Sequence, residues 1–341
     1  MFGAYRTSLA MMVVMLHYAN LAYIGNYAVF GFFALSGYLM TFIMQKNYGY
    51  TMHGLGAYAL NRFLRIYPLY WMSCLVAIAI LLFLDTEYTA RNPAFAMPET
   101  FVQWGKNLGL TLRFTTRPML IVPAWALTVE LFFYICIGLG ASRNKLISAV
   151  WFSLSVSYTA YLIASGASFG ERYQTLGAAS LPFSTGAMIF HWRDELRRLF
   201  GPIAEYSYAP ALLFMLIIAN WMVAKLSGGL LQWGFYSNYI LCAIMIISLF
   251  HRKQLPFISR KWDSWMGDLS YPLYLLHFPL GFLFLYCFNR IGFDFAEPEM
   301  AFFLVATPFL LLAAWAMAVG VEQRVELLRN WVKQSLPDKS V

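Results

Sequence analysis

Residues 67–84 read YPLYWMSCLVAIAILLFL, a stretch without a single charged side chain. A helix needs about 20 mostly apolar residues to cross a bilayer, and this stretch is close to that length. No water reaches the bilayer core, so the backbone N–H and C=O groups of such a segment must bond to one another, as they do in a helix. The alternating pattern of a membrane β-strand is absent. The stretch therefore predicts a membrane-spanning helix.

Nine further apolar runs of similar length occur along the chain. With the first, they give ten predicted spans: residues 5–23, 27–45, 67–84, 121–140, 146–165, 175–191, 207–224, 232–250, 268–288 and 300–321. The sixth span is the shortest and carries Pro182. We predict an all-α, polytopic bundle of ten transmembrane helices.

The composition agrees with a membrane protein. Of 341 residues, 60% are hydrophobic and 12% are charged, whereas a soluble domain carries about 25% charged residues. This excludes an ordinary soluble enzyme. The net charge is +8, but no cluster of Lys and Arg lies in a polar domain, so nucleic acid is not an expected partner. The four cysteines all lie within apolar runs, and we expect neither a disulfide nor a metal site.

The positive charges predict the orientation of the bundle. With the N-terminus in the cytoplasm, 17 of the 24 Lys and Arg residues fall in the inner loops and 7 in the outer ones. Such an excess marks the cytoplasmic side, so both termini are predicted inside. We expect one transmembrane domain over residues 1–322 and a short cytoplasmic tail over residues 323–341.

The first predicted helix carries two ionisable side chains on one face. Arg6 and His17 are eleven residues apart, almost three full helical turns, or about 16 Å along the axis. Arg6 would lie at the cytoplasmic mouth and His17 well inside the bilayer. Burial should keep the imidazole neutral, the form that accepts a proton. The alternatives are a structural histidine and an arginine that only anchors the helix end.

Two arginines precede the third predicted span. Arg62 and Arg65 are three residues apart, so a helix would place both guanidinium groups on one face at its inner end. Two planar guanidinium groups suit phosphates, such as those of coenzyme A. Paired arginines at an inner helix end are also common topology anchors, and the spacing alone favours this second interpretation.

Glu130 is the only carboxylate well inside a predicted span. An unpaired carboxylate there would be protonated, so we expect it to meet an arginine, a histidine or backbone donors. In the ninth span, Ser270, Tyr274 and His277 follow at i, i+4 and i+7 on one stripe. This stripe is either a second polar wall of a site that contacts substrate or a structural packing seam.

Five motifs occur in an order and spacing that resemble the integral-membrane acyltransferase-3 family. They are Arg6 and His17 with ten residues between them, Phe32-Phe33-x-x-Ser36-Gly37-Tyr38, Arg62-x-x-Arg65-Ile66-Tyr67-Pro68, Trp125-x-x-x-x-Glu130-x-x-Phe133-Tyr134, and Ser270-Tyr271-x-x-Tyr274-x-x-His277. They extend from the first predicted helix to the ninth. We expect a stand-alone member, without the periplasmic SGNH hydrolase-like domain fused to many relatives.

The resemblance implies a ten-helix enzyme that moves an acyl group, most often acetyl, from cytoplasmic acyl-CoA to a hydroxyl of a carbohydrate. It implies that His17 is the family's essential histidine and general base, and that Arg6 is its paired arginine. Arg62 and Arg65 match the motif associated with the CoA donor, and Glu130 matches the intramembrane acid. His277 is a common feature of the family. No metal is implied.

The expected partners are acyl-CoA, a carbohydrate or lipid-linked glycan acceptor, and membrane lipid. The expected location is the inner, cytoplasmic membrane of a bacterium, where O-acetylation would modify a cell-envelope polysaccharide. The competing hypothesis is a proton-coupled secondary transporter, because buried His, Glu and Arg also form proton relays. Such transporters often contain internal repeats, and no motif occurs twice in this sequence.

Overall fold

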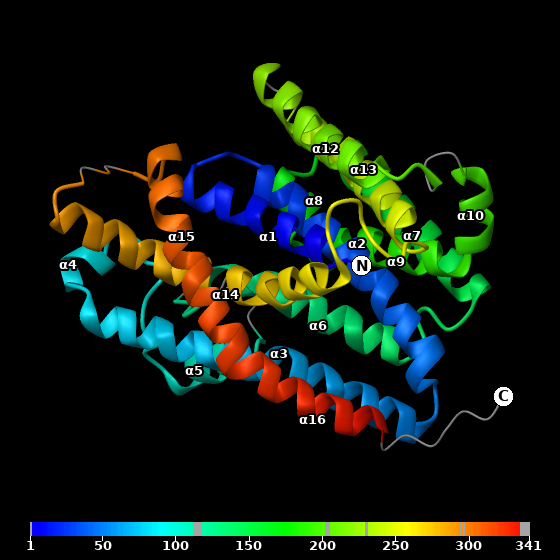
Figure 1. Ribbon diagram of the computed structural model, residues 1–341, viewed down its shortest axis with the longest axis horizontal. Helices are drawn as coiled ribbons and strands as arrows, with labels where there is room; N and C mark the ends of the chain where they lie inside the picture. Colours follow the sequence, from blue (N-terminus) through cyan, green and yellow to red (C-terminus); the bar gives the residue numbers. More distant parts are fainter. Residues whose placement is uncertain are drawn as a thin grey trace. The chain divides into compact units, whose positions relative to one another are not determined.

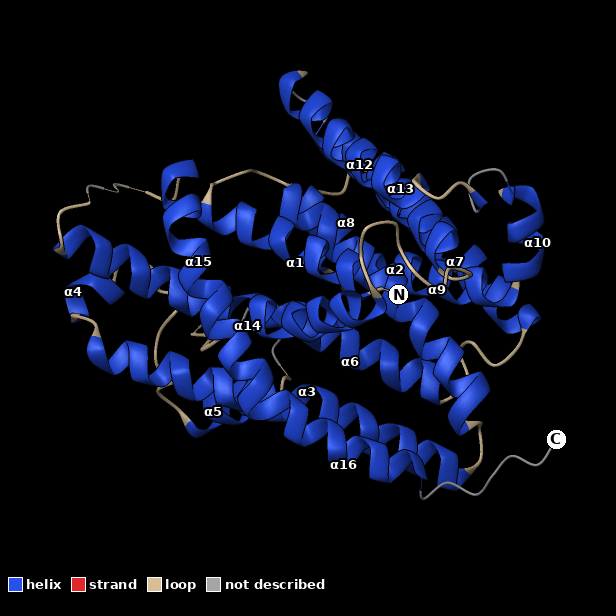
Figure 2. Cartoon of the chain, viewed as in Figure 1, coloured by secondary structure: helices blue, strands red, loops and turns tan. Residues whose placement is uncertain are grey.

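The computed structural model describes residues 2–111, 118–201, 205–228, 231–293, 295 and 297–334 (Figure 1). Within these ranges the regular structure is helical, and strand-like pairing is limited to one isolated bridge between Leu255 and Ile258 (Figure 2). The predicted all-α class is confirmed.

Each predicted span overlaps a helix. The ten helices are α1 (Gly3–Tyr18), α2 (Ile24–Ile43), α3 (Met52–Phe83), α6 (Trp125–Gly138), α7 (Lys145–Ala164), α9 (Leu176–His191), α12 (Ala209–Leu226), α13 (Leu231–Leu249), α14 (Arg260–Arg290) and α15 (Met300–Met317). Among the described residues, seven helices are long and apolar enough to cross a membrane. The chain is thus a multi-pass membrane protein, and the count of ten crossings and their orientation stay predictions.

The other three predicted spans coincide with shorter helices. α1 and α9 have 16 residues each and α6 has 14. Most of α9 is buried, with α2, α7 and α13 packed around it. A helix enclosed by other helices can be shorter than the bilayer is thick, because its ends meet protein and not lipid.

The helices form two compact units. Unit 1 consists of Met1–Leu9, Tyr23–Tyr58 and Val129–Gly267, and unit 2 consists of Ala10–Ala22, Ala59–Thr128 and Asp268–Val341. In unit 1, α2 packs against α9 and α13, α7 packs against α9, and α12 packs against α13.

Two glycines let α2 and α9 approach until their backbones touch. A Cβ added at Gly186 would overlap the carbonyl oxygen of Ala34, and one added at Gly37 would overlap the carbonyl oxygen of Phe183. Small residues at a helix contact are the usual route to close packing in membranes, where dispersion contacts drive association. Gly37, one of the small residues in the second predicted span, therefore serves helix packing.

In unit 2, α3 runs antiparallel to the continuous helix formed by α15, the π-helical turn η3 (Ala318–Glu322) and α16 (Gln323–Gln334) (Figure 1). Three contacts set the register. Ser73 contacts Met317, Arg65 pairs with Glu322, and the side chain of Asn61 donates to the carbonyl of Arg329. From the first contact to the last, the position moves 12 residues toward the start of α3 and 12 residues toward the end of α16.

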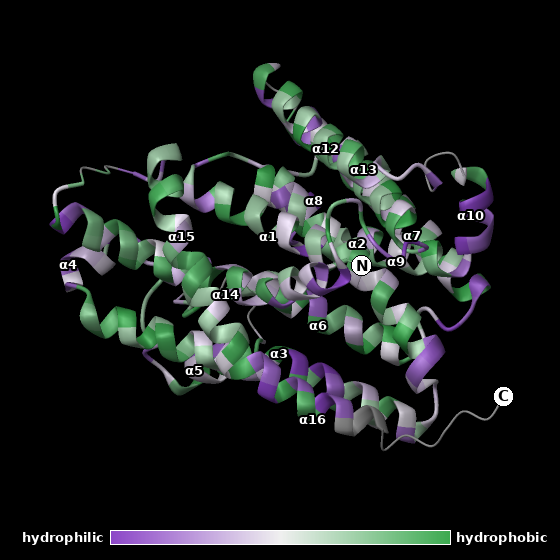
Figure 3. Cartoon of the chain, in the orientation of Figure 1, coloured by the Kyte–Doolittle hydropathy of each residue, from purple (hydrophilic) through white to green (hydrophobic). Residues whose placement is uncertain are grey.

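The structure corrects two boundaries. α3 begins at Met52, so the third predicted span, residues 67–84, is the second part of a longer helix. Pro68 lies inside this helix without ending it. Residues 323–334 continue the last helix as α16, where hydrophilic colouring predominates (Figure 3). The rest of the predicted tail, residues 335–341, lies outside the described residues, and the division at residue 322 stays a prediction.

Residues 85–120, which connect the third and fourth predicted spans, are partly helical. They contain α4 (Thr86–Thr89) and α5 (Phe101–Leu108), while residues 112–117 lie outside the described part. Three α3 side chains satisfy carbonyls at the end of α5, which have no partner within that helix. They are Tyr70 to Asn107 at 2.7 Å, Trp71 to Leu108 at 3.0 Å and Tyr67 to Gly109 at 3.0 Å.

The glycine contact between α2 and α9 generates a prediction. Gly186→Ala should lower the free energy of unfolding by about 1–3 kcal/mol, the usual cost of overpacking, because the added methyl group meets backbone that cannot rotate away. The control is Gly56→Ala, since Gly56 lies in α3 with nothing within 4 Å of an added Cβ. Thermal unfolding in detergent gives the melting temperatures of the two variants. Equal melting temperatures would contradict the packing described.

Candidate functional site

Two histidine rings face each other in unit 2. His17 is the last residue but one of α1, and His277 lies in the middle of α14. Their ring centroids are 5.1 Å apart with an interplanar angle of 34°. The ring of Phe278 lies edge-on to His17, with 5.5 Å between the centroids. The structure thus brings together two predicted site residues that are 260 positions apart in the chain.

The environment of His277 determines which of its nitrogens carries the proton. The side chain is 0% exposed, and its Nδ1 lies 2.8 Å from the backbone carbonyl oxygen of Tyr274. A carbonyl oxygen only accepts hydrogen bonds, so Nδ1 must carry the hydrogen and donate it. Nε2 then holds a lone pair. It is buried and has no hydrogen-bond partner among the described residues.

Tyr18 fastens the end of α1 to α14 beside the two histidines. Its hydroxyl donates to the backbone carbonyl of His277 at 2.7 Å, and its buried ring packs against Phe302. A Cβ added at Gly281 would overlap the Tyr18 ring. Because Tyr18 follows His17 directly, this contact also determines where the His17 side chain starts from the backbone.

The predicted polar stripe of α14 is buried. Ser270, Tyr274 and His277 are each less than 9% exposed. The Tyr274 hydroxyl donates to the carbonyl of Pro123 at 2.7 Å, in the short 3-10 helix η2 (Val122–Ala124). Tyr274 therefore supports the site twice, since its hydroxyl joins α14 to η2 and its carbonyl holds the His277 ring.

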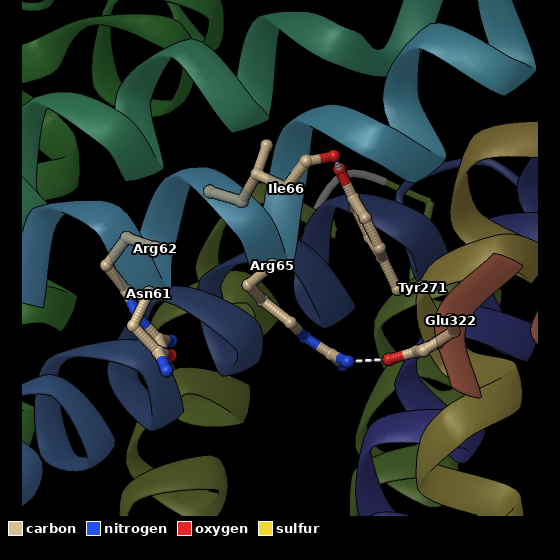
Figure 4. Close-up of polar contacts among 6 residues, drawn as sticks. All are labelled: Asn61, Arg62, Arg65, Ile66, Tyr271 and Glu322. Carbon is tan, nitrogen blue, oxygen red and sulfur yellow. Dashed lines mark hydrogen bonds and ion pairs between the residues drawn. The ribbon is translucent and has the colours of Figure 1, made fainter. Parts of the chain in front are cut away.

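Arg65 forms an ion pair with Glu322 of η3 (Figure 4). The side chains are 16% and 5% exposed, respectively, so both charges are largely withdrawn from solvent. The Arg65 guanidinium also lies over the ring of Tyr271, 5.9 Å from its centroid. Tyr271 in turn donates from its hydroxyl to the carbonyl of Ile66 at 2.9 Å. Arg65 is thus held in one orientation by groups from α14 and η3.

Arg62 has a different partner. Its guanidinium donates to the side-chain oxygen of Asn61 at 2.7 Å, and Figure 4 shows the two side chains lying together while Arg65 extends toward Glu322. Asn61 is fully buried and also donates to the carbonyl of Arg329. The two arginines, predicted to act as one clamp, are therefore held by separate partners in this structure.

Glu130 lies in unit 1 and is bound by hydroxyl groups. The Ser36 hydroxyl donates to its carboxylate at 2.6 Å, and the Tyr134 hydroxyl donates to the same oxygen. Tyr58 donates to the backbone carbonyl of Tyr134 at 3.1 Å. The sequence led us to expect an arginine, a histidine or backbone donors here, so the partners of Glu130 are corrected to two neutral side chains.

Arg6 also belongs to unit 1. It is half-buried on the second turn of α1. The start of that helix is capped by Asp263, whose carboxylate accepts from the backbone N–H of Gly3 at 3.3 Å and of Ala4 at 2.9 Å. Of the predicted site residues, Arg6 and Glu130 thus lie in unit 1, and the others lie in unit 2.

A series of aromatic rings leads away from His17 within unit 2. Phe278, which contacts His17, lies 5.8 Å from Phe95, and Phe95 lies 5.4 Å from Phe282. Phe282 lies 4.8 Å from Tyr88 in α4. The rings therefore form a continuous contact from the histidine pair to α4.

At the far end of this series, Asp85 joins the end of α3 to the end of α14. Its carboxylate accepts from the Tyr286 hydroxyl and from Arg290, both at 2.8 Å. The hydrogen bond from Tyr286, followed by that from Arg290 and its positive charge, holds the pKa of Asp85 below its ordinary value. Asp85 therefore stays ionised to a lower pH than a free aspartate.

Several residues of these clusters were not singled out in the sequence, among them Glu322, Tyr18 and Gly281. Tyr134 belongs to a quoted motif, and it is four residues after Glu130 and thus on the same helix face. Glu322 is one residue beyond the predicted end of the tenth span and the last residue of the predicted transmembrane domain. Tyr18 and Gly281 left no comparable signal. Among the described residues, no group of three or more His, Cys, Asp or Glu could hold a metal ion.

Comparison with known proteins gives one match. A family model described as an acyltransferase domain matches residues 4–319, which includes every residue of the clusters described above except Gly3, Glu322 and Arg329. No curated protein and no solved structure is matched.

The Arg65–Glu322 pair generates a prediction. Glu322→Gln removes one charge of a largely buried pair and leaves the other without compensation, which typically costs about 3–5 kcal/mol. We therefore expect a clear fall in the melting temperature of the purified protein. Glu326→Gln is the matched control, because Glu326 is exposed on the next turn of the same helix. If both variants have the same melting temperature as the unaltered protein, the ion pair does not hold η3 against α3.

Proposed function

The chain belongs to the acyltransferase 3 family, and on that premise we propose that it moves an acyl group from cytoplasmic acyl-CoA to a hydroxyl of a cell-envelope or exported glycan. The family match makes the protein an acyltransferase. It sets aside the proton-coupled transporter that the buried ionisable residues had left open. The acetyl group, the glycan acceptor and the bacterial inner membrane are the finer parts of the proposal.

His17 is the proposed general base. The acceptor hydroxyl attacks the thioester carbonyl while His17 takes the hydroxyl proton. The C–S bond then breaks, and the proton passes from His17 to the CoA thiolate, so that the products are the ester and free CoA. The observation that carries the proposal is an imidazole on a membrane helix of this family, set against a second imidazole at 5.1 Å.

Arg62 and Arg65 are the proposed binding residues for the donor's phosphates. A guanidinium has five N–H donors, so Arg65 can keep its ion pair with Glu322 and still offer donors to a phosphate. The carboxylate reduces the local positive charge but fixes the direction of the guanidinium, which lowers the entropy lost on binding. The side-chain oxygen of Asn61 likewise fixes the direction of the Arg62 guanidinium.

Arg6 and Glu130 are proposed as further catalytic residues, with Arg6 also contacting the donor. Their support is the match to the family's motifs and the high cost of placing ionisable groups in membrane helices without a function. Ser270, Tyr274 and His277 are proposed to support the site or contact substrate.

The proposal predicts that purified protein, given labelled acetyl-CoA and a glycan acceptor, releases free CoA and labels the glycan. His17→Ala should reduce the rate at least about 10²-fold, the lower end of what a general base contributes. The control is His53→Ala, because His53 is exposed near the start of α3 and should not affect the rate. Absence of CoA release by the unaltered protein would contradict the function, and an active His17→Ala variant would contradict the base.

A further inference from the structure

The buried lone pair of His277 is the feature of unit 2 that the proposed reaction does not yet use. Nε2 has no hydrogen-bond partner among the described residues, although leaving a buried acceptor unpaired costs about 1–3 kcal/mol. The imidazole of His17 lies beside the His277 ring, with 5.1 Å between the two centroids. An acceptor kept at such a cost beside the proposed base needs a role.

We propose that His277 is a positioning residue whose Nε2 accepts a hydrogen bond from His17 and thereby selects the nitrogen of His17 that acts as the base. The inference rests on the proposed function, because it assigns a partner to the same base. It gives His277 a role in the reaction that its position on a polar stripe of α14 does not reveal.

The first step is geometric. The nitrogens of an imidazole lie about 1.2 Å from its centre, so two rings with centroids 5.1 Å apart can bring facing nitrogens to about 3 Å, a normal hydrogen-bond length. Such contacts are often long in a substrate-free enzyme and tighten when substrate binds.

The second step is the tautomer. Neutral His17 has one N–H and one lone pair on opposite sides of its ring. His277 can only accept at Nε2, because its single hydrogen is on Nδ1 and points to the carbonyl of Tyr274. The N–H of His17 must therefore turn toward His277, and the lone pair of His17 must turn away from it, toward the acceptor hydroxyl.

The third step concerns the charge that forms during transfer. When His17 takes the hydroxyl proton it becomes an imidazolium with two N–H groups. One holds the new proton and the other remains bonded to Nε2 of His277, where the bond gains strength from the charge. In other general-base sites, an oriented carboxylate holds this N–H group of the imidazolium. Here the neutral ring of His277 has that role.

His277 does not carry the proton onward. A relay through its ring would need Nδ1 to release its hydrogen to the carbonyl of Tyr274, and a backbone carbonyl does not hold a proton at physiological pH. The hydroxyl proton therefore stays on His17 until the CoA thiolate takes it, and His277 begins and ends the cycle neutral. No other co-reactant is needed.

The test compares two side chains that each keep one half of the imidazole. In His277→Gln, the amide reaches the position of Nε2 and can accept from His17. In His277→Asn, the shorter amide reaches only the position of Nδ1 and can donate to Tyr274. His277→Phe keeps the ring and removes both nitrogens. The assay is CoA release from labelled acetyl-CoA with saturating acceptor, with kcat and KM for the donor measured separately.

We expect His277→Phe and His277→Asn to lose about 10²-fold in kcat, with the donor KM within about twofold because the donor phosphates bind elsewhere. His277→Gln should retain kcat within about tenfold. His53→Gln is the matched control for an exposed histidine. The unchanged KM shows that the variants are folded.

Other patterns would overturn the inference. If His277 serves only the structure, through its bond to Tyr274, the Asn variant should be the active one and the Gln variant should fail. Equal loss in both, or full kcat in the Phe variant, also contradicts the positioning role. All of these outcomes require activity in the unaltered protein, so they are distinct from failure of the proposed function, in which no CoA is released at all.

Discussion

The hydrogen bond from His277 Nδ1 to the carbonyl of Tyr274 is the interaction on which this account of the site depends. It is 2.8 Å long and fully buried, and because a carbonyl cannot donate, it leaves His277 with a lone pair on Nε2. The neighbouring contacts hold the His277 ring near that of His17. Tyr18 bonds the carbonyl of His277, and Tyr274 bonds η2. The chemistry of the pair follows from this one fixed proton.

The same constraint explains the other polar clusters. A charge or an unpaired polar group is expensive in a membrane helix, so each is expected to meet a partner. Arg65 meets Glu322, and Glu130 meets the hydroxyls of Ser36 and Tyr134. With only 12% of residues charged, the chain has few such groups to place. Those that lie inside helices are therefore informative about function, and the neutral contacts around them show how they are held.

The fold could be predicted from apolar runs because backbone pairing in lipid leaves helices as the available structure. Helix ends were harder to predict, since the third predicted span starts at residue 67, inside α3, and Glu322 lies just beyond an apolar run. His17, Arg62, Arg65 and Glu130 were proposed as site residues from their spacing or from their position in an apolar run. Their contacts could not be predicted, because Ser36 is 94 residues from Glu130 and His277 is 260 residues from His17. Such contacts depend on tertiary packing, which a local pattern does not contain.

The most direct measurement is the protonation of the two His277 nitrogens in the purified protein. Nitrogen-15 magnetic resonance on histidine-labelled protein in bilayers distinguishes a protonated from an unprotonated ring nitrogen, and the signals missing from the His277→Gln variant identify His277. We predict, at neutral pH, a hydrogen on Nδ1 and none on Nε2. A hydrogen on Nε2, or on both nitrogens, would contradict the account, because His277 could then accept nothing from His17.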